Sequence, residues 1–503
     1  MKRLIPAIFL ILNLTVSLVA STLHLSISSN PSKLNPLIAT DSASGEIADW
    51  IFDGLLAYDK DGHIEPRLAE SYRFENNTTL VFKLRRDVTW SDGVKFTAED
   101  VVFTWKLITS PNIFTPYSSA FRYVKEVRAP DSYTVVVIYT KPYFKALETW
   151  LTSIVPRHKL AGEKDIMTSS FNQHPVGTGP YTIDGFEVSQ DIVLKANDHY
   201  FRHRPHIDRI VYHFMPDPGT QFLMLKSHKL DVGSLTPLQY ERQIDDDFHR
   251  YYRIYEKISQ SYTYLGFNLK NPKFQDPRVR EALSLAINRQ ELVDILFFGH
   301  GRVCTGPFMP GTFAFNDQIK APVQNIKKAK KLLHEAGYDE KHPLKFEIVT
   351  NSNNPIRVYA AQIIQYQLAK AGVRATIRTM EWQAFLNTVV MPRKFETVIL
   401  GWGLGLMPDA YSIWHSEGSK KGGFNFISYK NPKVDALIKE AEQTIDRKKL
   451  GKIYREIFAL IVQDNPYLFL YIPNSITVVN REIQNVSQSI LGVMHNVIDW
   501  IKP

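Results

Sequence analysis

The chain has 503 residues, of which 44% are hydrophobic and 22% are charged, so it is long enough for two or three lobes and is neither disordered nor fibrous. Its formal net charge is +9, but the basic residues are scattered and no recognisable nucleic-acid module is present, so we expect no nucleic-acid partner. The single cysteine, Cys304, cannot form an internal disulfide, and we interpret it as a small packed residue.

The first 21 residues have the pattern of a secretory signal peptide. Lys2 and Arg3 precede an apolar stretch that reaches Val19, and the small residues Ala20 and Ser21 follow. The stretch is slightly short for a membrane anchor and contains polar residues, which favours cleavage near Ala20 or Ser21. No later stretch is long and apolar enough to cross a bilayer, so we expect a soluble mature chain.

Periodic patterns predict a mixed α/β protein. In the N-terminal half, Thr97 is a good N-cap for a helix at 98–107, with Asp100 three residues on. A strand at 344–350, a helix at 355–371 and a strand at 373–379 form a βαβ unit. The other predicted helices are 43–58, 277–297, 325–336, 432–443 and 447–463, and the other predicted strands are 79–86, 133–139, 181–195, 397–400, 467–472 and 475–479.

Several motifs together resemble one protein family. The most distinctive is FKLRRDVTWSDGVKFTAEDVVFTW at 82–105, and LGFNLKNPKFQDPRVREALSLAINRQELV lies at 265–293. With these segments the chain resembles family 5 of the extracellular solute-binding proteins, which includes dipeptide-, oligopeptide- and nickel-binding proteins of ABC importers. The further matching segments are 34–72, 175–181 (PVGTGPY), 371–386 and 429–441.

The resemblance implies a two-lobed, periplasmic-binding-protein-like α/β fold of class II that encloses its ligand when the lobes close. Lobe I would combine residues 22–48, 172–264 and 473–503. An extra domain, II, would be inserted at 49–171, and lobe III would span 265–472.

The resemblance also implies the function. We expect the periplasmic substrate-binding component of an ABC importer, which binds short peptides between its lobes and delivers them to permease subunits in the inner membrane. Cys304 is too far from the signal segment to carry a lipid, so we expect an unlipidated monomer in a Gram-negative periplasm. The chain has no G-x-S-x-G, H-E-x-x-H or Walker A motif, and we expect neither enzymatic activity nor a cofactor. The alternatives are a carrier of a nickel or other metal-chelate complex and a secreted peptidase or chaperone on the same fold.

A candidate ligand-binding segment follows the strand at 397–400. Gly401 and Gly403 expose backbone on either side of Trp402, and in the family the corresponding strand end pairs its main chain with a peptide. A turn with a core tryptophan is the structural alternative. Arg357 begins the helix 355–371, close to where dipeptide-binding relatives carry an arginine for the ligand carboxylate, although it also suits a surface position.

The usual partner of the ligand amine is missing from its expected position. Dipeptide- and oligopeptide-binding relatives place an aspartate three residues after the tryptophan, where this chain has Gly405, or Leu404 if a one-residue gap is introduced. Asp409, or Asp41 from the opposite lobe, could replace it through a charge-assisted hydrogen bond, and each is equally suited to capping a helix or lying in a loop.

Histidines give no regular metal signature. His199, His203, His206 and His213 have irregular spacing, which is typical of a solvated turn, so we predict no metal site there. His415 lies nearest the inferred cleft and is the single weak candidate for contacting a bound metal complex.

Overall fold

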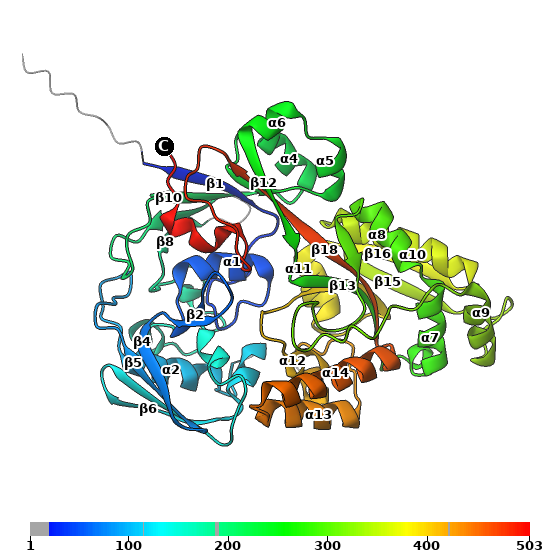
Figure 1. Ribbon diagram of the computed structural model, residues 1–503, viewed down its shortest axis with the longest axis horizontal. Coiled ribbons are helices and arrows are strands. Elements are labelled where there is room, and N and C mark those ends of the chain that lie inside the picture. The colour runs from blue at the N-terminus through cyan, green and yellow to red at the C-terminus, as the bar shows by residue number, and fades with distance from the viewer. Residues whose placement is uncertain (1–19, 114, 187–190, 421–422) are drawn as a thin grey trace, which may run out of the picture.

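The computed structural model describes residues 20–113, 115–186, 191–420 and 423–503. Two lobes lie side by side, with the N-terminal segments on the left of Figure 1 and most of the later segments on the right. Apart from Ala20 and Ser21, the predicted signal segment lies outside the described residues. No helix in the described part of the chain is long and apolar enough to cross a bilayer.

The left lobe contains two sheets that share one hydrophobic core. In the first, β1 runs parallel to β10, and the order is β1 (Thr22–Ile27), β10 (Arg209–Phe214), β9 (Ile192–Ala196) and β8 (Tyr181–Phe186). The second is antiparallel, in the order β4 (Ala69–Asn76), β5 (Thr79–Leu84), β7 (Thr134–Tyr139) and β6 (Val124–Asp131). This lobe also contains α1 (Ser42–Ile51), β2 (Leu56–Tyr58), β3 (Ile64–Pro66), α2 (Ala98–Ile108) and α3 (Arg157–Leu160).

The right lobe is built on a larger mixed sheet that continues into the left lobe. Its order is β11 (Val232–Ser234), β18 (Tyr467–Asn480), β13 (Ser261–Phe267), β17 (Thr397–Gly403), β15 (Lys345–Asn351) and β16 (Arg374–Met380). Two further strands, β12 (Tyr252–Ile258) and β14 (Gly301–Val303), pair with β18. The helices after β14 are α9 (Ile326–Glu335), α10 (Pro355–Lys370), α11 (Trp382–Phe385), α12 (Tyr411–Trp414), α13 (Pro432–Gln443) and α14 (Arg447–Asp464).

The long strand β18 connects the two lobes. Its first half pairs with β13 and β14, and its second half pairs with β12 and β11. The sequence predicted two strands here, and the structure corrects this to one. The strand is continuous because Pro473 is paired with β14 and Asn474 is paired with β12. The boundary predicted at residues 472 and 473 falls at this crossing, which supports our division of the chain into lobes; the division itself stays a prediction.

Two helices are shorter in the structure than the sequence pattern predicted. The helix predicted at 43–58 ends at Ile51, because Gly54 forms a bridge with Ser153 and lies so close to the backbone of Leu151 that a side chain would not fit. The helix predicted at 277–297 is two helices, α7 (Pro277–Ala286) and α8 (Arg289–Phe297). They separate because Ile287 is extended and the Asn288 side chain accepts from the Glu291 amide, which makes Asn288 the N-cap of α8.

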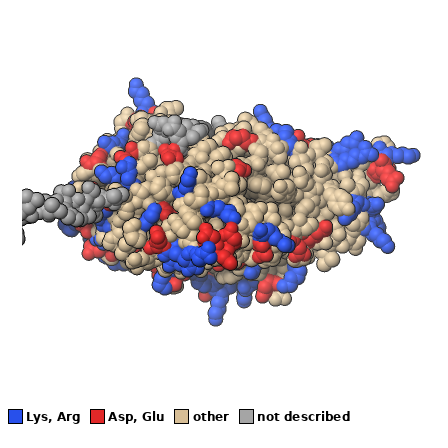
Figure 2. Space-filling view, turned by 90° about the horizontal axis from the view of Figure 1, so that it is seen from above, with Lys and Arg blue, Asp and Glu red and all other residues tan. Residues whose placement is uncertain are grey.

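The main local predictions are confirmed. β15, α10 and β16 form the predicted βαβ unit, with the two strands parallel. The backbone amide of Thr97 donates to the Asp100 side chain at 2.9 Å, which supports the start of α2. Figure 2 shows acidic and basic side chains interspersed over the face that it presents, in keeping with the scattered charge of the sequence.

Candidate functional site

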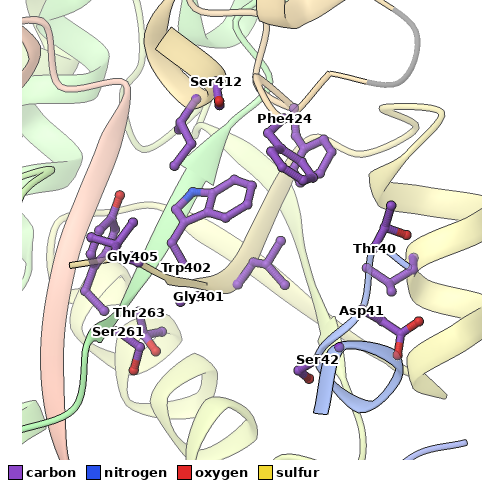
Figure 3. A pocket seen from close by; sticks show the side chains of 18 of the residues that line it. Thr40, Asp41, Ser42, Ser261, Thr263, Gly401, Trp402, Gly405, Ser412 and Phe424 are labelled. Carbon is purple, nitrogen blue, oxygen red and sulfur yellow. The ribbon is translucent and has the colours of Figure 1, made fainter. Parts of the chain in front are cut away.

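A cavity of about 1560 Å³ lies between the lobes and takes residues from both. Its volume exceeds the roughly 300–1,000 Å³ that is usual for small-molecule sites. One wall is the end of β17 with Gly401, Trp402 and Gly403, and Figure 3 shows Asp41, next to α1, across the pocket from them. The cavity therefore brings together the candidate residues that the sequence placed in different lobes.

The end of β17 presents backbone hydrogen-bonding groups on one edge. β13 pairs with β17 along its whole length, but β15 pairs with it only at Thr397 and Val398. The amide of Leu404 donates to the carbonyl of Gln260, and hydrogen-bonded pairs alternate along an antiparallel ladder. The N–H and C=O groups of Gly401 and Gly403 consequently point away from β13, toward the edge that β15 leaves uncovered.

Arg357 lies directly against this strand. A Cβ atom on residue 401 would be 2.7 Å from Arg357 Nη2, so the missing side chain of Gly401 makes room for the guanidinium group. Nη1 donates to the Asn351 side chain at 3.0 Å, and Nε is buried without a hydrogen-bond acceptor in the described part of the protein. Burial lowers the pKa of Arg357, and Tyr471 and Tyr264 partly offset this effect.

Trp402 lines the cavity while its ring packs among aromatic side chains. Its Nε1 donates to the hydroxyl of Tyr467 at 3.3 Å, and the ring stacks on Phe426 with centroids 5.4 Å apart. Phe424 contacts the same ring edge-on at 5.5 Å. These contacts hold the indole rigidly, so the ring forms a preformed apolar part of the cavity wall.

Asp41 carries a buried carboxylate on the other side of the cavity. It is the N-cap of α1 and accepts from the amide and hydroxyl of Ser44, at 2.9 and 2.7 Å, and from the hydroxyl of Ser32 at 2.6 Å. All of these donors are neutral, and no cationic side chain in the described regions forms an ion pair with Asp41. Asp41 thus caps helix α1 and also lines the cavity.

Asp409 also lines the cavity, but its carboxylate is engaged. Lys145, from the segment predicted as the inserted domain, pairs with Oδ2 at 2.9 Å, and the hydroxyl of Ser412 donates to the same oxygen at 3.0 Å. Burial opposes ionisation, but Lys145 and then Arg122 outweigh it and hold the pKa of Asp409 well below its usual range. Asp409 therefore connects two parts of the protein that are far apart in the sequence, a contact that no local motif indicated.

His415 does not line the cavity. It is buried, its ring stacks on Tyr411 with centroids 4.4 Å apart, and its Nδ1 accepts from the amide of Glu417. Burial lowers the pKa of His415, and Asp435 partly opposes the shift. Cys304 is likewise buried, in agreement with its interpretation as a packed residue, and burial raises the pKa of its thiol to about 12.

Sequence reasoning missed two cations that line the cavity. Lys33 follows β1, and its Nζ donates to the carbonyl of Met167. Arg393 adopts a left-handed backbone conformation, with φ 59°, and its guanidinium donates to main-chain carbonyls that include that of Lys420 at 3.0 Å. Neither residue lies in a recognisable motif, so only the fold could place them here.

Known proteins match the whole architecture. The oligopeptide-binding protein AppA of Bacillus subtilis is 30% identical over 93% of this chain and 89% of its own length. The structure of that AppA in complex with a nonapeptide matches with a TM-score of 0.90 and 29% identity, over 96% of this chain and 99% of that one. NikZ from Campylobacter jejuni, in complex with Ni(L-His), matches with a TM-score of 0.87 and 27% identity, over 96% and 99% of the two chains.

These matches confirm the two-lobed fold that the sequence motifs implied. A family model described as bacterial extracellular solute-binding proteins, family 5 middle, covers residues 63–424, which is more than half of the chain. The chain belongs to the extracellular solute-binding proteins of family 5, a family of binding proteins and not of enzymes.

Proposed function

We propose that this protein binds a peptide of several residues between its lobes and delivers it to the permease of an ABC importer. The observation that carries the proposal is the uncovered edge of β17, where Gly401 and Gly403 direct their backbone groups into the cavity. An extended peptide can pair with such an edge irrespective of its side chains. The cavity volume of about 1560 Å³ supports a ligand larger than a dipeptide.

The two ends of the peptide have complementary partners in opposite lobes. Arg357 lies beside Gly401 with an unsatisfied Nε, which suits bidentate pairing with a carboxylate. Asp41 is a buried carboxylate without a cationic partner in the described regions, which suits the peptide ammonium. We favour Asp41 over Asp409 for this role because Lys145 already neutralises Asp409.

The location and the partners follow from the family and from the N-terminal pattern. The family is extracellular, and residues 1–21 have the features of a cleaved signal without a lipid-bearing cysteine. We therefore place the mature protein in a periplasm, as a monomer that meets its permease at the inner membrane.

A metal chelate is the second candidate ligand, since NikZ from Campylobacter jejuni was solved with Ni(L-His). The cavity-lining residues of the described regions include no histidine or cysteine. A metal would thus have to bring its nitrogen ligands with it. Calorimetry with Ni²⁺ alone and with Ni²⁺ plus histidine separates this candidate from a peptide carrier.

The peptide proposal is tested by identifying the retained ligand and by removing one wall of the cavity. Native mass spectrometry of protein purified without unfolding should reveal a bound peptide. Titration with a pentapeptide should change tryptophan fluorescence, and Trp402→Ala should weaken binding by about 1–3 kcal/mol, the scale for burying a large apolar side chain. If folded Trp402→Ala binds the pentapeptide as tightly as the unmodified protein, the peptide does not lie against β17.

A further inference from the structure

The charged residues that line the cavity do not balance. In the described part of the chain they are Lys33, Asp41, Arg357, Arg393 and Asp409. Asp409 is neutralised by Lys145, which does not line the cavity. Three cations therefore face one carboxylate that lacks a cationic partner, which leaves a surplus of two positive charges on the wall.

Each of the three cations lacks an acidic partner among the described residues. Among the described residues, Arg393 donates only to main-chain carbonyls and to no carboxylate, and Lys33 donates to the carbonyl of Met167. Arg357 reaches the neutral amide of Asn351 and keeps one buried N–H without an acceptor. Carbonyl and amide groups satisfy hydrogen bonds but do not neutralise the charge.

Partial burial makes this surplus significant. Burial is the main cause that lowers the pKa of Arg357 and of Arg393, so both guanidinium groups are partly shielded from solvent. Charges that are withdrawn from water are weakly screened and are costly unless an opposite charge pairs with them. Lobe closure around a neutral ligand would leave these cations uncompensated.

We propose that the ligand is an acidic oligopeptide, with about two carboxylates in addition to its terminal groups. The inference rests on the proposed peptide function. Asp41 balances the peptide ammonium and Arg357 balances the terminal carboxylate, so Lys33 and Arg393 remain for two acidic side chains. Lys33 follows β1 in the left lobe and Arg393 precedes β17 in the right lobe, so an acidic peptide would contact both lobes through ion pairs.

Calorimetry with three pentapeptides tests the charge preference. The peptides are Ala-Glu-Ala-Glu-Ala, Ala-Gln-Ala-Gln-Ala and Ala-Lys-Ala-Lys-Ala, all with free termini and at 150 mM salt, where exposed charges are largely screened. The acidic peptide should bind about 10-fold or more tightly than the glutamine peptide, and the lysine peptide should bind most weakly. If none of the three binds, the peptide function itself fails. If all three bind equally, that function stands and the acidic preference is refuted.

Variants assign the preference to particular residues. Arg393→Gln and Lys33→Gln should each reduce the affinity ratio of the acidic to the glutamine peptide by about 3- to 10-fold, and Arg393→Lys should retain most of it. Lys394→Gln is the matched control, because this exposed neighbour removes the same charge without lining the cavity. If Arg393→Gln does not fold, Lys33→Gln alone decides. An unchanged ratio in folded Lys33→Gln and Arg393→Gln would refute the assignment.

Discussion

The contact between Gly401 and Arg357 makes a sharp prediction for Gly401→Ala. A Cβ atom at position 401 would be 2.7 Å from Arg357 Nη2, whereas ordinary contacts begin near 3.4 Å, so the guanidinium group must retreat by about 0.7 Å. The carbonyl of Tyr262, at 3.0 Å from the same Cβ position, belongs to the backbone and gives way less easily. The arginine should therefore lose its bidentate geometry toward a ligand carboxylate while the sheet stays intact.

The expected loss is that of a charge-assisted hydrogen bond, about 1.5–3 kcal/mol, or about 10- to 100-fold in affinity. The assay is calorimetry with one pentapeptide as the free acid and as the C-terminal amide. The unmodified protein should prefer the free acid, and Gly401→Ala should abolish most of this preference. The matched control is Gly403→Ala, where a Cβ atom meets nothing within 4 Å, and it should keep the ratio of acid to amide affinity. If Gly401→Ala weakens both peptides equally, Arg357 does not bind the terminal carboxylate.

Three further predictions concern the ion pair of Asp409, the ion pairs of His300 and the start of the mature chain. Asp409→Asn should lower the free energy of unfolding at pH 7 by about 1–3 kcal/mol, because it leaves the partly buried Lys145 without a counter-charge. Since the folded pKa of Asp409 is depressed, thermal unfolding should show this difference above about pH 4 and its loss as the pH falls below that. His300 contacts Glu241 and Glu256 at 2.7 Å each, and these carboxylates outweigh burial and raise its pKa. The unmodified protein should therefore be more stable than His300→Gln by the full amount below about pH 6.5, and this difference should disappear as the pH rises above the folded pKa of His300. Equal melting curves of the two proteins at pH 5.5 would contradict this. N-terminal sequencing of the secreted protein should find Ser21 or Thr22 first, because the predicted signal segment ends there; an uncleaved chain in the membrane fraction would contradict it.

The sequence contained enough information to predict the local structure of the cavity wall at the end of β17. The strand at 397–400 is apolar from Val398 to Leu400 and the next residues are Gly-Trp-Gly, so both the buried strand and its exposed backbone end could be predicted. The βαβ unit was predictable for the same reason, since its periodicity changes from strand to helix and back within 36 residues of chain. Both features depend on residues that are neighbours in sequence.

The charges of the site could not be predicted in the same way. Lys145 and Asp409 are 264 positions apart, and only the packing of the lobes brings them together. Before that contact is known, Asp409 and Asp41 are equivalent candidates, since each precedes a helix and each can cap it. A carboxylate becomes a ligand site through the lack of a cation nearby, and that depends on tertiary contacts.

The same contacts explain how a ligand can control closure. Lys145 pairs with Asp409, Arg122 pairs with Glu442, and the amide of Phe144 donates to the carbonyl of Glu442, so the segment predicted as the inserted domain is already bound to the right lobe. These pairs are internally neutral and need no ligand. Lys33, Arg357 and Arg393 lack such partners in the described regions, so withdrawing their charges from water as the lobes close costs energy in an empty cavity. A ligand shifts an equilibrium only by its preference for one state, and an acidic peptide gains its ion pairs in both lobes only when they are closed. These contacts thus favour closure without a ligand, whereas the proposed surplus of positive charge opposes it until an acidic ligand binds.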